Sequence, residues 1–223
     1  MGSTFYSSLT KKYIMSLAGL FLMTFLFVHL AINLLLLFDD SRGLFNEAAH
    51  FMGTNPFIQT FQWVLFGGFF IHILFGLILQ IQNWMARPKG YKKKAVSEDN
   101  YFSKFMIHTG IIIGVFLAFH LADFFVKKIT GTVPEFHHGD LAHMEDMGIL
   151  VLEKFKMLGY VIFYVAALLF LGFHLDHAFQ SAFPSLGLNN NKYTPAIKWL
   201  SHFIAIVLTV GYISIPVCIY FFK

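Results

Sequence analysis

Four histidines lie inside long apolar stretches of the sequence, where few other ionisable side chains occur. They are His29, His72, His120 and His174, and each belongs to a different stretch. An ionisable side chain within a membrane span is costly and usually functional. Neutral imidazole binds iron well, and two imidazoles on opposite faces of a haem fill both of its axial positions. These four residues therefore indicate haem ligation.

The depth of each histidine within its stretch sorts the four into two pairs. Consecutive spans cross a membrane in opposite directions, so His29 and His120 fall in the outer half of the bilayer and His72 and His174 fall in the inner half. We expect His29 and His120 to hold an outer haem, and His72 and His174 to hold an inner haem. Filled axial positions leave no site for oxygen, which favours electron transfer.

Helix packing is a less specific interpretation of these histidines than haem ligation. A lone histidine in a span is more often a hydrogen-bonded packing residue than a ligand, but four in two depth-matched pairs favour ligation. Gly68 and Gly76 share a helix face with His72 and could admit a flat macrocycle, or could serve helix packing alone. His177 follows His174 by one helical turn, so spacing does not decide which of the two is the ligand.

The amino-acid composition indicates that the protein folds in a membrane. Hydrophobic residues make up 57% of the 223 positions and charged residues 13%, which is too apolar for an ordinary soluble domain. Five apolar segments match or exceed the roughly 20 residues that cross a bilayer. We therefore expect an all-α fold, an integral membrane bundle of five transmembrane helices in one domain, residues 1–223. The expected spans are about 13–38, 57–84, 105–126, 155–183 and 197–222.

The lysines and arginines give the expected orientation. Lys11, Lys12 and the basic loop at residues 87–94 lie on the same side of the membrane, and an excess of cations marks the cytoplasmic side. The chain is thus expected to be multi-pass with a cytoplasmic N-terminus. The net charge of +4 comes from cations beside the spans, so no nucleic acid partner is expected. A single cysteine, Cys218, excludes an internal disulfide and a cysteine-ligated iron–sulfur cluster within the chain.

Residues 173–183 carry the sequence Phe-His-Leu-Asp-His-Ala-Phe-Gln-Ser-Ala-Phe. They resemble the fourth-helix signature of succinate dehydrogenase and fumarate reductase cytochrome b subunits, of the di-haem type with five helices in one chain. Residues 27–30, 72–76 and 119–123 resemble the same family around the other three histidines. In this family the first histidine of the signature is the ligand, which implies His174 and not His177, and the haems are held by the same helix pairs as derived above.

The resemblance also implies cofactors, partners and place. The chain would bind two haem b and would anchor a flavoprotein subunit carrying FAD and an iron–sulfur subunit to a bacterial cytoplasmic membrane. Electrons would pass between the iron–sulfur subunit and menaquinone through both haems. The dicarboxylate chemistry would belong to the flavoprotein, since this chain has no nucleotide-binding glycine pattern. Some fumarate reductases of the family have a glutamate where this chain has Gly172.

Quinone chemistry needs a proton partner near the membrane surface. We expect Glu47, just before the second span, to take this role on the outer side. Other outer candidates are His50, Asn33 and Asp123, and inner candidates are Ser16, Gln80, Asn83, Trp84, His177 and Gln180. Two alternative functions stay open: a haem b subunit of another respiratory complex, such as formate dehydrogenase or hydrogenase, and a haem-free transport protein with histidines along a polar channel.

Overall fold

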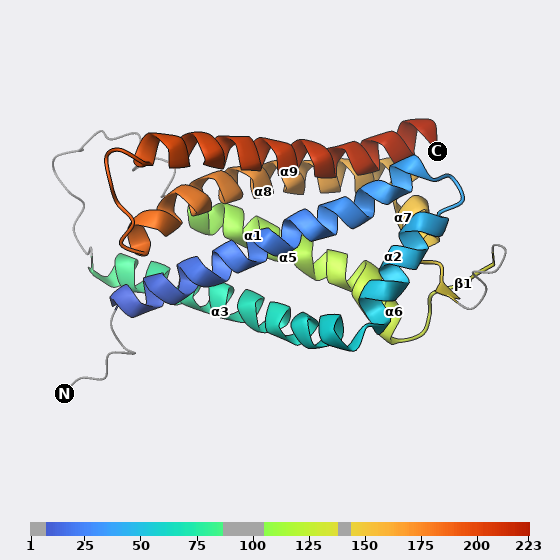
Figure 1. Cartoon of the computed structure of the whole chain (residues 1–223), viewed down its shortest axis with the longest axis horizontal. Helices are drawn as coiled ribbons and strands as arrows, with labels where there is room; N and C mark the ends of the chain where they lie inside the picture. Colours follow the sequence, from blue (N-terminus) through green and yellow to red (C-terminus); the bar gives the residue numbers. More distant parts are fainter. Residues whose placement is uncertain (1–7, 87–104, 138–143) are drawn as a thin grey trace.

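The computed structural model describes residues 8–86, 105–137 and 144–223. Nearly all of them are helical, because apolar residues of good helix propensity fill the long segments. Figure 1 shows the elements in chain order: α1 (Ser8–Phe38), α2 (Gly43–Thr54), α3 (Pro56–Ala86), α5 (Met106–His120), η2 (Leu121–Val126), α6 (Lys127–Ile129), β1 (Glu135–Phe136), β2 (Met144–Glu145), α7 (Met147–Phe155), α8 (Leu158–Ser185) and α9 (Thr194–Phe222).

Within the described residues, five helices are long and apolar enough to cross a membrane, which confirms the predicted all-α bundle of five spans. Their bounds are Leu9–Phe38, Pro56–Ala86, Met106–Ile129, Leu158–Ser185 and Thr194–Phe222. The third span runs from α5 through the wider π-helical turn η2 into α6 without a break. The fourth begins at Leu158 and not at residue 155, because a turn after Phe155 separates α7 from α8.

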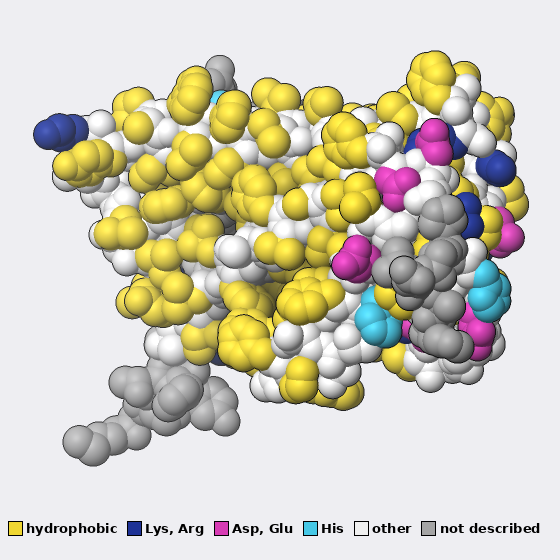
Figure 2. Space-filling model, turned by 45° about the vertical axis from the view of Figure 1, so that its right-hand side comes forward, with side chains coloured by type: hydrophobic (Ala, Val, Ile, Leu, Met, Phe, Trp, Pro, Cys, Tyr) yellow, Lys and Arg dark blue, Asp and Glu magenta, His cyan; other side chains and the backbone are white. Residues whose placement is uncertain are grey.

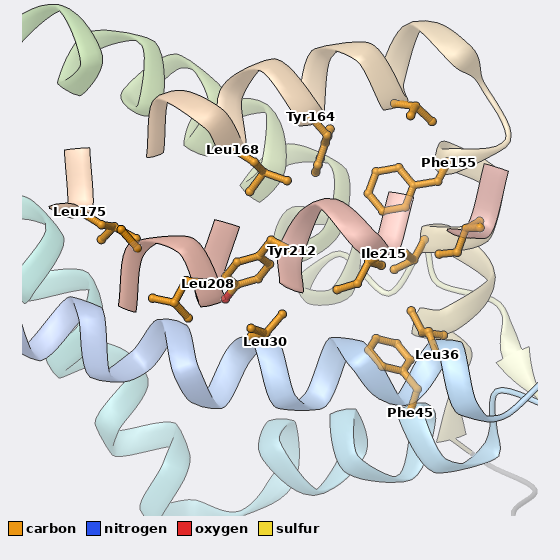
Figure 3. Packing of buried hydrophobic residues seen from close by; sticks show 14 of the residues in the cluster. Leu30, Leu36, Phe45, Phe155, Tyr164, Leu168, Leu175, Leu208, Tyr212 and Ile215 are labelled. Carbon is orange, nitrogen blue, oxygen red and sulfur yellow. The ribbon is translucent and has the colours of Figure 1, made fainter. Parts of the chain in front are cut away.

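The packed core lies between α1, α8 and α9. Figure 3 shows Leu30 of α1 facing Leu208 and Tyr212 of α9, with Leu168 and Leu175 of α8 nearby. The Tyr212 hydroxyl donates a hydrogen bond to the Leu26 carbonyl at 2.7 Å, which ties α9 to α1. Helices α3 and α5 are the least buried of the five spans. Figure 2 shows hydrophobic side chains along the length of the bundle, as a protein surrounded by lipid requires.

One end of the bundle carries an extra layer made of α2, α7, β1 and β2 (Figure 1); we call it the capped end, and the opposite end, where α1 begins, the N-terminal end. Arg42 joins the layer together by donating to both carboxylate oxygens of Asp146, at 3.2 and 2.8 Å. Asn46 donates to the same carboxylate at 2.8 Å and accepts from the Gly148 amide at 2.9 Å. Acidic, basic and histidine side chains gather at this end (Figure 2).

Candidate functional site

The structure brings the four span histidines together in two pairs. His29 of α1 faces His120 of α5, with ring centroids 5.8 Å apart and ring planes at 86°. His72 of α3 faces His174 of α8, with ring centroids 6.2 Å apart and ring planes at 76°. These are the pairs expected from depth alone. The His29–His120 pair lies toward the capped end, and the His72–His174 pair lies toward the N-terminal end.

The separation within each pair fits one metal atom between two rings. An imidazole nitrogen binds a transition metal at about 2 Å and lies about 1 Å from the centre of its ring, so two rings on opposite sides of a metal have centres roughly 6 Å apart. Within the described residues, no group of three or more histidine, cysteine, aspartate or glutamate side chains could hold a metal ion. Two ligands per site suit a metal that brings its other ligands with it, as haem iron does.

Hydrogen bonds to Nδ1 determine which ring nitrogen of His72 and of His174 can bind a metal. The Met15 carbonyl lies 3.4 Å from Nδ1 of His72, and a carbonyl only accepts. Thr109 donates its hydroxyl proton to the Met106 carbonyl at 3.0 Å, so its oxygen accepts from Nδ1 of His174 at 3.1 Å. Both contacts place the ring proton on Nδ1 and leave Nε2 unprotonated, which is the form that binds a metal.

Glycines make room around His72. A Cβ atom on Gly19 of α1 would lie 3.3 Å from Cε1 of the His72 ring, so Gly19 permits the close approach of this ring to α1. Gly68 faces Phe21 of α1, and a Cβ there would lie 3.3 Å from the Phe21 ring. Of the two roles considered for Gly68, this contact favours helix packing.

A cavity of about 590 Å³ opens beside the His29–His120 pair. Its volume lies within the range of roughly 300–1,000 Å³ found for organic-ligand pockets. Its walls are mostly apolar and aromatic, and Phe45 and Met52 of α2 and Met147 of α7 close it toward the capped end. The polar side chains that line it, besides the two histidines, are Thr24, Asn33, Gln62, Lys128, Tyr164 and Tyr212.

The outer quinone candidates are placed differently from one another. Glu47 is exposed on α2 and is not among the residues that line the cavity, because Phe45 and Ala49 turn the opposite face of α2 toward it. Asn33 does line the cavity and donates to the His29 carbonyl at 2.8 Å. Asp123 is in η2 and accepts hydrogen bonds from Lys154 and Tyr160.

Asp123 takes part in a polar network just after His120. Lys154 of α7 donates to its carboxylate at 2.6 Å, and the Tyr160 hydroxyl of α8 donates at 3.0 Å. The wider turn of η2 begins directly after His120, and such turns often occur at functional sites. This network joins three elements at the capped end, and its acid is therefore not a free proton acceptor.

Of the inner candidates, the structure brings His177 and Gln180 together. His177 and Gln180 line a second cavity, of about 310 Å³, between the end of α8 and the start of α9. Asp176 behind it accepts hydrogen bonds from Gln180 at 3.0 Å and Ser201 at 2.7 Å, and pairs with His202 at 2.9 Å. Sequence reasoning missed this cluster, although an acidic residue within the fourth span was a signal for it. Ser16 is buried, Gln80 is half-buried, and Asn83 and Trp84 are exposed.

Gly172 of α8 packs directly against Thr209 of α9. A Cβ atom at this position would overlap the hydroxyl of Thr209, so a glutamate side chain has no room beside the present Thr209. A proton route through a carboxylate at this position is therefore absent from this chain.

Compared with protein families, curated proteins and solved structures, the chain has no match. An inference about its function therefore depends on its own residues and on their geometry.

Proposed function

We propose that this chain is the membrane anchor and di-haem cytochrome b subunit of a succinate:quinone oxidoreductase, either succinate dehydrogenase or quinol:fumarate reductase. The observation that carries the proposal is the presence of two histidine pairs, from four helices, with ring centroids 5.8 and 6.2 Å apart. Residues 173–183 support the choice of family, because their sequence resembles the fourth-helix signature of these subunits.

The residues fit two haem b groups. His29 with His120, and His72 with His174, would be the axial ligands, and bound haem b supplies one-electron iron chemistry. Thr109 and the Met15 carbonyl orient the rings of the second pair. The walls of the cavity beside the first pair are mostly apolar and aromatic. On α8, ten residues separate His174 from Tyr164, which touches His120, so the two pairs lie about 15 Å apart along the bundle.

The two histidine pairs, at different levels of the bundle, suggest how electrons would cross the membrane. The flavoprotein and the iron–sulfur subunit would bind at the N-terminal end, which would lie in the cytoplasm of a bacterium if the excess of cations marks that side. The basic loop at residues 87–94, which is expected on the same side and would help to bind the iron–sulfur subunit, lies outside the described residues. Menaquinone would react near the capped end, since the His29–His120 pair and its cavity lie there. Glu47 would serve this reaction only from the surface of α2.

The alternative is a haem b subunit of formate dehydrogenase or a hydrogenase, which also presents histidines from several helices. Purification of the complex from native membranes separates the two. We expect two haem b per chain by pyridine haemochrome, co-purification of an FAD protein and an iron–sulfur protein, and reduction of both haems by succinate. Reduction by formate or hydrogen but not by succinate would identify the alternative. A preparation without haem would overturn both.

A further inference from the structure

Lys128 occupies an unusual place in the structure. Among the described residues that line the cavity beside His29 and His120, it is the only lysine, arginine, aspartate or glutamate. No acidic side chain in the described ranges pairs with it. A charged group facing an apolar cavity is costly unless a partner of opposite charge is present. The partner of Lys128 is therefore to be sought in the ligand of the cavity.

The fold aims the Lys128 side chain at this cavity. Lys128 follows His120 by eight residues in one continuous span, about 12 Å along the helix axis. Helical side chains lean toward the N-terminus of their helix, which for Lys128 is the direction of His120. Gly53 of α2 leaves room for the Lys128 side chain, because a Cβ atom on Gly53 would overlap the Lys128 amine and would lie 3.0 Å from its Cε.

An ordinary structural role for Lys128 is to interact with the C-terminal end of α2, where a cation is favourable. Three of the carbonyls there already have partners. Gly53 accepts from the Gln59 side chain at 2.8 Å, Phe51 accepts from the Asn55 amide at 3.0 Å, and His50 accepts from the Thr54 hydroxyl at 2.8 Å. These three carbonyls do not need the amine of Lys128, which lies on the wall of the cavity.

We infer that the Lys128 ammonium binds a carboxylate of the ligand that fills this cavity. The inference rests on the proposed function, under which that carboxylate is a propionate of the haem held by His29 and His120. A lysine and a carboxylate form a strong, charge-assisted hydrogen bond, and here it forms within apolar walls where the attraction is weakly screened. The haem of this pair thus has its propionate edge toward the capped end.

The test compares Lys128→Gln with Lys127→Gln in the purified complex. Lys127 is the neighbouring lysine of α6 and does not line the cavity. Redox titration of each haem is the first measurement. Removal of a cation favours the more positive oxidised iron, so Lys128→Gln should lower the midpoint potential of the His29–His120 haem alone. The potential of the His72–His174 haem serves as the internal control for folding, and Lys127→Gln should change neither.

The second measurement removes the charge from the ligand. The haem-depleted protein is reconstituted with haem b or with its dimethyl ester, which has no carboxylate. We expect the wild type to bind the ester at the His29–His120 site at least tenfold more weakly than haem, and Lys128→Gln to bind the two alike. Equal discrimination in wild type and Lys128→Gln would overturn the inference while leaving the proposed function intact. A wild type that binds no haem would instead overturn the proposed function, and the inference with it.

Discussion

The hydroxyl oxygen of Thr109 on α5 lies 3.1 Å from Nδ1 of His174 on α8. At the other level of the bundle the same two helices exchange roles, because the Tyr164 hydroxyl of α8 lies 3.3 Å from Nδ1 of His120 on α5. The helices run in opposite directions side by side. Each of them therefore carries one histidine and orients the histidine of the other.

Thr109→Val removes the hydroxyl and keeps the shape of the side chain. His174 then loses the acceptor of its Nδ1 proton, and partners of this kind change metal affinity about 10–100-fold. We expect about tenfold faster haem loss from the His72–His174 pair, with the other haem unchanged, measured as haem release to apomyoglobin. Thr60→Val is the matched control, since Thr60 bonds only the Pro56 carbonyl of its own helix and is exposed. Equal haem retention in the two variants would exclude an orienting role for Thr109.

The ligand assignment is tested by His174→Ala and His177→Ala. His174 faces His72, whereas His177 lines the separate cavity near the start of α9. Loss of an axial ligand should deplete the haem of the His72–His174 pair, so His174→Ala should leave about one haem per chain and His177→Ala two. Pyridine haemochrome of the purified variants measures this. The assignment is wrong if His177→Ala loses a haem and His174→Ala retains both.

The sequence predicts the positions of residues along the spans better than the side-chain contacts between helices. The spans and the depth of His29 and His174 follow from length and position along the chain, so they can be predicted without tertiary contacts. The contact of Thr109 with His174 and that of Lys128 with Gly53 join residues more than sixty positions apart in the sequence. No local pattern encodes such contacts.

Glu47 illustrates a signal that was present and not used. The apolar residues Phe45, Ala49 and Met52 are spaced as one face of an α-helix, and they line the cavity. Glu47 falls on the opposite face and is exposed. Its position in the chain predicts the end of the bundle at which Glu47 lies, but not the direction of its side chain.

Gly172→Ala should destabilise the protein, because the added methyl group would overlap Thr209 of α9. Overpacking of this kind typically costs about 1–3 kcal/mol, which thermal unfolding in detergent would detect. Thr209→Ala in the same chain should restore most of the loss. Gly159→Ala is the matched control, since Gly159 is in the same helix and a Cβ there meets no atom within 4 Å. Equal unfolding temperatures for the two glycine variants would contradict the close packing.

The capped end should lose stability in acid. Burial alone would raise the pKa of Asp146, but hydrogen bonds from Arg42, Asn46 and the Ile149 amide outweigh it and hold that pKa below its ordinary value. A carboxylate with a lowered pKa stabilises the fold above its unfolded pKa, near 3.9, and this contribution disappears as the pH falls through the folded value. Asp146→Asn should cost about 2–3 kcal/mol at pH 7, after allowance for the partial exposure of Arg42.

Unfolding temperature measured between about pH 3 and pH 7 tests this prediction. Wild type should lose stability toward the acid end, and Asp146→Asn should show a smaller loss over the same range. Asp40→Asn is the control, because Asp40 pairs with Lys223 at the surface and is almost fully exposed. A parallel pH dependence in wild type and Asp146→Asn would show that Asp146 does not carry the effect.

The last prediction concerns the polar group that meets the quinone. Gln62 of α3 lines the cavity beside His29 and His120, so its amide could donate to the oxygen of a quinone at the edge of the haem proposed there. Glu47 is exposed and turned away from this cavity. We therefore expect Gln62→Leu to lower quinone-linked turnover about tenfold, which corresponds to the loss of one well-placed hydrogen bond, and Glu47→Gln to have little effect.

Two assays of the complex make this comparison specific to the quinone. Under the proposed function, quinone-linked turnover would depend on the haems and on the quinone site, whereas succinate oxidation with an artificial acceptor would bypass both. Gln62→Leu should impair the first assay, leave the second unchanged and retain two haems, because Gln62 is not an axial ligand. If Glu47→Gln impairs the first assay and Gln62→Leu does not, the quinone reacts at the surface of α2 and not beside Gln62 at the edge of the haem, and the role first expected for Glu47 would stand.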